Sequence, residues 1–143
     1  MEINGLPLHP LVVHAAVIFG PIAALVALAF LVPRWRLKLR WPMVGLALVA
    51  TASLLAAYFS GDNFLEHRPE LGQSPQVQEH EDRAGQLLWV TIAFGVIALA
   101  SGWLATRTGA LRVVLDVLLA VASVALLVLV FLTGEAGARA VWG

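Results

Sequence analysis

The side chains of this sequence that could bind a haem iron or another metal ion are histidines and carboxylates. Because the chain has no cysteine, thiolate metal sites, iron–sulfur clusters and covalently attached c-type haem are excluded. His14 and His80 could supply the two imidazole ligands of a b-type haem. Imidazoles combined with a carboxylate would instead suit zinc, copper or iron. The residues that could form such a metal site are His9, His14, Asp62, His67, His80 and Glu135.

Other kinds of chemistry find little support in the sequence. No serine stands at motif spacing from a histidine and an acid, and there is no glycine-rich phosphate loop. The sequence therefore gives no support to enzymatic activity. The formal net charge is zero, so there is no electrostatic reason to expect nucleic acid as a partner.

The composition predicts that lipid is the solvent for this fold. Of the 143 residues, 60% are hydrophobic and 13% are charged, whereas soluble domains are about half apolar and about a quarter charged. Runs with few charges are long enough to cross a bilayer, and they must be helices because lipid offers the backbone no hydrogen-bond partners. The expected spans are about 8–32, 41–61, 84–106 and 111–133. We predict one all-α domain over residues 1–143, an up-down-up-down four-helix transmembrane bundle.

The uneven distribution of charge predicts the orientation in the membrane. An even number of spans puts both termini and the long loop, 62–83, at one end of the bundle, which we name the terminal end. The two short loops and their borders form the short-loop end, whose six cations are Arg34, Arg36, Lys38, Arg40, Arg107 and Arg112. The terminal end has three cations and eight acids. The positive-inside rule makes the short-loop end cytoplasmic, so both termini are expected to be extracytoplasmic.

Helix starts predicted from the prolines place two histidines at one height. Spans one and three run in the same direction and can lie diagonally across the bundle. Pro7 and Pro10 require the first helix to begin near them, because proline suits the first turn of a helix. Ser74 and Pro75 are a typical N-cap and first residue for the third helix. His14 and His80 are then expected at heights that match within roughly one turn.

His9 and His14 differ by about 140° around a regular helix, so they cannot both face one core site. We expect His14 to face inward, because it lies deeper and an imidazole facing lipid there would be costly. Asp62 and Glu135, at the ends of spans two and four, come to the same end of the bundle. Ala84 and the small residues of span two could leave room for a porphyrin. The aromatic residues that could wall it are Phe19, Tyr58, Phe59 and Trp89.

Asp116 interrupts the fourth span near the short-loop end. An acid inside a membrane segment suggests a functional role by default. Asp116 also lies one helical turn after Arg112, so an ion pair with Arg112, or with a cation of the first short loop, would satisfy it structurally. We favour the structural interpretation.

The segment GLPLHPLVVH, residues 5–14, resembles the opening of a family of small four-span bacterial membrane proteins, domain of unknown function 2231. The family's HPxxVH pattern is present at residues 9–14, its Gly-Asp near the end of span two at residues 61–62, and its histidine at the start of span three at His80. The chain has Ala15-Ala16 where the family often has Phe-Pro, and its long loop is more acidic. The resemblance implies a bacterial inner-membrane protein. Relatives that carry Rieske-like or cytochrome-like domains imply membrane electron transfer.

The leading hypothesis is a b-type haem protein of electron transfer, with the haem near the outer face between spans one and three. A redox partner would dock at the outer face on the acidic loop, residues 62–82. Two alternatives stay open. The same histidines and carboxylates could bind or transport a divalent ion of zinc, copper or iron, or the chain could be a structural subunit of a larger membrane complex. The sequence leaves open whether copies of the chain associate with one another.

Overall fold

A computed structural model describes the backbone of residues 2–3, 6–67 and 75–142, and the side chains of residues 13–59, 78 and 82–133. In this part of the chain, two two-residue strands, β1 (Glu2–Ile3) and β2 (Leu6–Pro7), pair antiparallel and precede the helices. The helices are α1 (Leu8–Phe30), α2 (Arg36–His67), α3 (Pro75–Trp103) and α4 (Ala110–Trp142). The first and third helices begin where the prolines predict.

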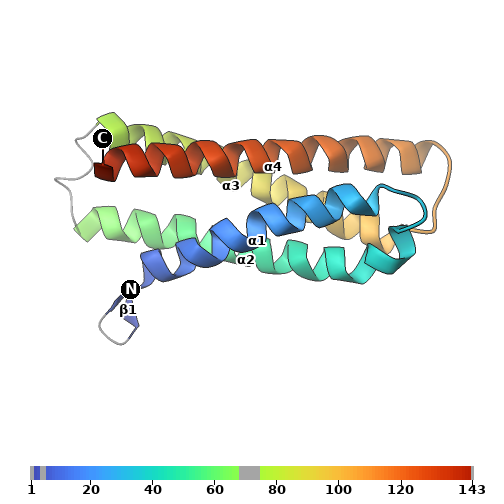
Figure 1. The fold of residues 1–143 in the computed structure, drawn as a ribbon, viewed down its shortest axis with the longest axis horizontal. Helices are drawn as coiled ribbons and strands as arrows, with labels where there is room; N and C mark the ends of the chain where they lie inside the picture. Colours follow the sequence, from blue (N-terminus) through green and yellow to red (C-terminus); the bar gives the residue numbers. More distant parts are fainter. Residues whose placement is uncertain (1, 4–5, 68–74, 143) are drawn as a thin grey trace.

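The helices form an up-down-up-down bundle made of two hairpins (Figure 1). The most extensive contacts join α1 to α2 and α3 to α4, and smaller ones join α2 to α3 and α1 to α4. Helices α1 and α3 therefore lie on one diagonal of the bundle and α2 and α4 on the other. The predicted all-α four-helix architecture is confirmed.

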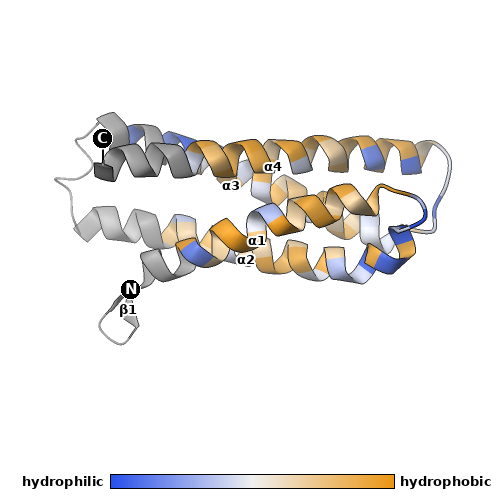
Figure 2. Cartoon of the chain, in the orientation of Figure 1, coloured by the Kyte–Doolittle hydropathy of each residue, from blue (hydrophilic) through white to orange (hydrophobic). Residues whose placement is uncertain are grey.

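Each helix contains a segment long and apolar enough to cross a membrane. Over the described residues these segments are Val13–Phe30, Arg36–Phe59, Asp82–Trp103 and Ala110–Thr133, and they form a continuous apolar belt (Figure 2). The helices are longer than the predicted spans: residues 62–67 belong to α2 and residues 75–83 to α3, which shortens the expected loop. Hydropathy marks the part of a helix that lipid covers, whereas the backbone hydrogen bonds continue past it into the aqueous border.

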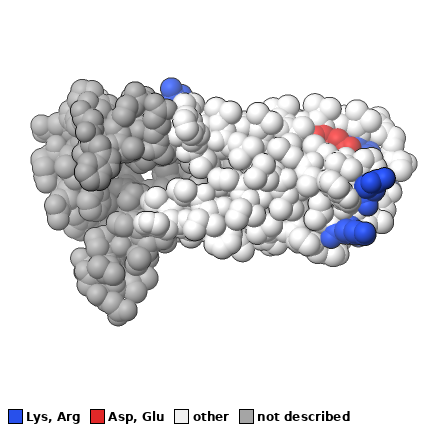
Figure 3. All heavy atoms as spheres, in the orientation of Figure 1, with Lys and Arg blue, Asp and Glu red and all other residues white. Residues whose placement is uncertain are grey.

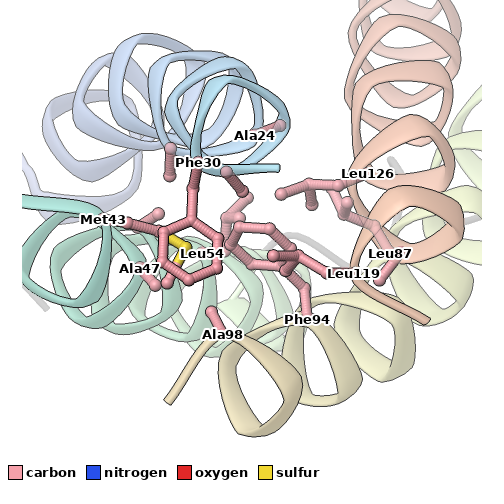
Figure 4. Packing of buried hydrophobic residues seen from close by; sticks show 14 of the residues in the cluster. Ala24, Phe30, Met43, Ala47, Leu54, Leu87, Phe94, Ala98, Leu119 and Leu126 are labelled. Atoms are coloured by element: carbon pink, nitrogen blue, oxygen red, sulfur yellow. The ribbon is translucent and has the colours of Figure 1, made fainter. Parts of the chain in front are cut away.

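The interior of the bundle is built largely from small side chains. Helix α1 presents Ala16, Ala23 and Ala27 at near-heptad spacing, each at most 4% exposed. Larger residues fill the space between the hairpins, and those labelled in Figure 4 include Phe30, Met43, Leu54, Phe94, Leu119 and Leu126. Since lipid tails are as apolar as leucine, the hydrophobic effect does little between helices in a membrane. Close van der Waals packing of these small surfaces is what holds the bundle together.

Two glycines of α3 allow the closest approach between the hairpins. A Cβ added at Gly95 would lie 2.8 Å from Thr51 Oγ1 of α2, and one added at Gly102 would overlap Val44 Cγ2. Gly102 lies seven residues after Gly95, and Val44 lies seven residues before Thr51. The two contacts therefore lie on one seam between α2 and α3. On α2 this seam is formed by Thr51 and Val44, which are not among the smallest residues of the helix. The sequence alone does not show which small residues meet a neighbouring helix.

We predict that Gly102→Ala destabilises the bundle by about 1–3 kcal/mol, the usual cost of overpacking. The overlap is with a β-branched side chain, whose χ1 angle is nearly fixed in a helix, so Val44 has little freedom to move aside. The measurement is unfolding of purified protein by titration of dodecyl sulfate into mixed micelles, followed by circular dichroism.

Gly45→Ala is the matched control, because an added Cβ at Gly45 meets nothing within 4 Å. Its stability should equal that of the parent or exceed it slightly, given the higher helix propensity of alanine. Equal stability of the Gly102→Ala and Gly45→Ala variants would contradict a close helix contact at Gly102.

Candidate functional site

The histidines and carboxylates expected to bind a cofactor all lie at the terminal end. Of these, His14 has a described side chain. The side chains of His9, Asp62, His67, His80 and Glu135 lie outside the described residues, although all five positions belong to the helices. Among the described side chains, no three histidines or acids come together as a metal site. The positions of the others are given by the register of their helices.

His14 differs from the sequence-based expectation, because it is an exposed residue rather than a core residue. It lies two positions before Ala16, which is 4% exposed, and two positions correspond to about 160° around a helix. The face of α1 that contacts the bundle is the alanine face. Position 14 is on the opposite side of the helix.

Positions 9 and 80 continue the buried faces of α1 and α3. Residues seven positions apart lie within about 20° of one another on a helix. Position 9 is seven before Ala16, and position 80 is seven before Leu87, which is 7% exposed. Position 9 therefore lies on the same line of α1 as Ala16, whereas position 14 does not.

The contacts around two glycines also place positions 9 and 80 at one height. A Cβ added at Gly20 would lie 3.7 Å from Leu54 Cδ1, and Gly95 faces Thr51, three residues earlier on α2. Position 20 of α1 is therefore level with about position 92 of α3. On the side of the terminal end, position 9 precedes position 20 and position 80 precedes position 92 by nearly equal numbers of residues. At about 1.5 Å per residue, the heights of positions 9 and 80 along the bundle therefore differ by roughly 2 Å. His14 lies roughly 9 Å nearer the short-loop end than His80.

The other candidate ligands do not share the core-facing lines. Position 135 is one turn after Phe131, which is 69% exposed, and so lies on the outer face of α4. Position 62 is about 80° from the line of Leu54 on α2. Position 67 is five turns from Val49, which is 44% exposed, and lies on the same side of α2. Helix register thus places positions 9 and 80 on the core-facing lines of α1 and α3, and positions 62, 67 and 135 off the core-facing lines of α2 and α4.

Two of the aromatic residues expected to wall a porphyrin face away from the bundle. Trp89 is 72% exposed and Phe59 is 56% exposed, so both lie on the lipid-facing surface. Phe19 packs against the core, and Tyr58 is half-buried with its ring edge-on to Phe59, the ring centroids being 5.4 Å apart. Phe19 is the member of the expected set that remains placed to line an internal site.

At the short-loop end, Asp116 is held by two arginines. Arg112 Nε donates to Asp116 Oδ1 at 2.9 Å, and Arg36 Nη2 donates to Oδ2 at 3.0 Å. The arginine side chains are 8% and 13% exposed and that of Asp116 is 30% exposed. The sequence allows either pairing, and the structure contains both. The carboxylate therefore joins α4 to the first residue of α2, which supports the structural interpretation of this acid.

At the same end of the bundle, arginine side chains donate to carbonyls in and just after the last turns of α1 and α3. Arg36 donates to the carbonyls of Phe30 and Leu31, at 3.4 and 3.1 Å. Arg40 donates to those of Gly102 and Trp103, at 2.6 and 3.1 Å, and Arg112 to that of Leu104 at 3.0 Å. Helix ends leave such carbonyls without partners and carry partial negative charge, so cations are favourable there.

The ring of Phe30 supports the two guanidinium groups. The Arg36 Cζ lies 5.4 Å and the Arg112 Cζ 5.7 Å from the centroid of this fully buried ring, within the range of cation–π attraction. Arg40, which the sequence analysis treated as one of several surface cations, crosses from α2 to α3 and stacks on Trp41 at 4.5 Å. The sequence signal for this role was the closely spaced cations of residues 34–40, which lie beside predicted helix ends whose carbonyls need hydrogen-bond donors.

Comparison with known proteins places the chain in a family. The sequence model of the family described as "Predicted membrane protein (DUF2231)" matches residues 5–143. No curated protein and no solved structure matches the chain.

We predict that Asp116→Asn destabilises the bundle by about 2–4 kcal/mol, because it leaves two largely buried guanidinium groups without a counter-charge. The partial exposure of the carboxylate puts the value toward the lower part of this range. The same micelle titration measures it. Arg83→Gln is the control, since Arg83 makes an exposed hydrogen bond to Gln86, and it should change stability by less than about 0.5 kcal/mol. Similar losses in both variants would show that Asp116 does not link the helices.

Proposed function

The chain belongs to the DUF2231 family of predicted membrane proteins, and from this premise we propose that it binds a b-type haem and transfers electrons in the bacterial inner membrane. The described residues contain four helices able to span a membrane. The haem would lie near the terminal end between α1 and α3. The proposed ligands are His80 and, in place of His14, His9.

The observation that carries this proposal is the shared register of positions 9 and 80. They lie on diagonal helices that run in the same direction, each seven residues before a buried core residue. Their heights agree within roughly 2 Å. Two imidazoles that face one another across a bundle are the ligand set of a low-spin b-type haem.

The residues nearest these positions leave room for a flat cofactor. Ala16 and Gly20 are buried on α1, and Ala84 is half-buried on α3, so small side chains follow both histidine positions toward the bundle centre. Phe19, which packs against the core, would add an apolar wall. A bound haem would supply one-electron transfer. The chain's own contribution would be to bind the iron through two imidazoles and to shield the ring from water.

Register favours haem over a divalent metal ion. A zinc, copper or iron site without porphyrin would draw on Asp62, His67 or Glu135 as further ligands. Position 135 falls on the outer face of α4 with Phe131, and position 62 lies about 80° from the core-facing line of α2. A pair of imidazoles without an inward carboxylate suits an iron that already has four porphyrin nitrogens.

The orientation that we propose puts the haem on the outer side of the membrane. At the short-loop end the described residues include six Lys and Arg and one acid, Asp116 (Figure 3). By the positive-inside rule this end is cytoplasmic, and the termini are extracytoplasmic. An electron partner would then approach from the outside, where residues 62–82, which include the adjoining ends of α2 and α3, contain six acids.

We predict that the protein, purified in mild detergent from haem-replete cells, has a Soret band that shifts on reduction with dithionite, and a sharp α band. His9→Ala and His80→Ala should each abolish this low-spin spectrum, because each would remove one of the two residues proposed to hold the iron. His14→Ala, on the opposite face of α1, is the matched control and should keep it.

Other outcomes identify the alternatives. An unchanged spectrum in both the His9→Ala and the His80→Ala protein would refute the ligand pair. Loss of the spectrum in His14→Ala but not in His9→Ala would instead support His14 and His80 as the ligands. A stoichiometric metal ion without porphyrin would indicate ion binding or transport. A protein without any cofactor but with a stable co-purifying membrane complex would indicate a structural subunit.

We further predict that a thiol at the short-loop end is reached from the cytoplasm. The chain has no cysteine, so Thr108→Cys, in an exposed connection, introduces a single thiol. A membrane-impermeant maleimide should label it in inverted vesicles and not in spheroplasts. Gln78→Cys, an exposed position at the terminal end, should show the opposite pattern. Labelling of Thr108→Cys in spheroplasts would reverse the proposed orientation.

A further inference from the structure

The cations of the short-loop end fall into two groups. Arg36, Arg40 and Arg112 are bonded to helix carbonyls, and two of them also bind Asp116. A second group of three, which we name the free cations, is exposed, and its side chains make no hydrogen bond or ion pair with other described residues. These are Arg34, Lys38 and Arg107. The first group makes hydrogen bonds and ion pairs that join the helices at this end, and the side chains of the second group make none with described residues.

Three exposed tryptophans lie near the free cations in the sequence. Trp35, Trp41 and Trp103 are 45%, 55% and 73% exposed. Trp35 directly precedes one membrane-spanning segment, Trp103 ends another, and Trp41 lies in the second turn of α2. Indole rings prefer the border between hydrocarbon and water. Arg34 and Lys38 lie within three residues of Trp35, so their charges reach the phosphate layer.

The positive charge of this end is not neutralised within the described structure. Asp116 is its one acid among the described residues, and it is already shared between Arg36 and Arg112. Exposed apolar side chains stand next to the free cations. Leu37 is 63% exposed and precedes Lys38, and Leu111 is 47% exposed on the first turn of α4. A partner that fits this surface carries negative charge and apolar chains together.

We propose that the free cations bind the phosphate headgroups of anionic phospholipids in the leaflet at the short-loop end, with the acyl chains lying on Leu37 and Leu111. Basic clusters beside transmembrane helices attract anionic lipids by an amount that grows with each Lys or Arg. A dissolved phosphate would meet the same charges but would leave the apolar surface unused. The combined surface therefore favours a lipid as the source of the phosphate.

The test measures which lipids surround the three tryptophans. The protein carries Trp89→Phe and Trp142→Phe, so its remaining tryptophans are Trp35, Trp41 and Trp103. It is placed in phosphatidylcholine nanodiscs that contain equal fractions of bromine-labelled phosphatidylglycerol or bromine-labelled phosphatidylcholine. Bromine quenches the fluorescence of tryptophans that it contacts. We expect the anionic lipid to associate at least about threefold more strongly than the zwitterionic one.

The variants separate the free cations from charge in general. Replacing Arg34, Lys38 and Arg107 together by glutamine should remove the preference. The matched control replaces the chain's three remaining basic residues, Arg68, Arg83 and Arg139, by glutamine, which changes the net charge equally at the terminal end. This control should retain the preference. Both proteins are first shown by circular dichroism to have the parent's helix content.

Three results would overturn the proposal. The first is equal quenching by the two labelled lipids in the parent protein. The second is an unchanged preference after the free cations are replaced. The third is loss of the preference on addition of inorganic phosphate but not of chloride at equal ionic strength, which would identify a site for free phosphate rather than lipid.

Discussion

The last carbonyl groups of α1 and α3 lie at a membrane border, where an unsatisfied backbone acceptor is costly. Three arginines supply their donors. Arg36 and Arg112 each bind carbonyls at the end of a helix and also share the carboxylate of Asp116, while Arg40 reaches from α2 to the end of α3. One acid thus lets two guanidinium groups stand close together over the ring of Phe30. At the short-loop end, this network joins the α1–α2 hairpin to the α3–α4 hairpin.

Close packing between α2 and α3 fixes the relative height of the two hairpins along the rest of the bundle. Gly95 and Gly102 of α3 meet Thr51 and Val44 of α2 on one seam, and such close contacts leave little freedom to slide one hairpin along the other. The relative height of α1 and α3 follows from these contacts. The level that positions 9 and 80 share is therefore a consequence of packing between hairpins, several turns away from either histidine.

The two ends of the molecule have different chemistry. The short-loop end uses its buried charges for structure and presents further cations to the headgroup region. The terminal end has all the histidines and eight of the nine acids. A cofactor at the terminal end would be separated from the short-loop network by the apolar length of the bundle. The proposed electron transfer would therefore take place on one side of the membrane, and the proposed lipid contacts would form on the other.

Local sequence and the requirements of lipid determined the helical class, the number of spans, and the helix starts near Pro10 and at Pro75. They also offered Arg112 as one of two possible partners of Asp116. These depend on neighbours in sequence and on solvent. The tertiary structure decided which face of each helix is inside, that Arg36 shares Asp116, and that position 9 rather than 14 continues the buried line of α1. In water, polarity marks the outer face of a helix. In lipid both faces are apolar, so side-chain size and fit select the inner face, and these depend on the neighbouring helix.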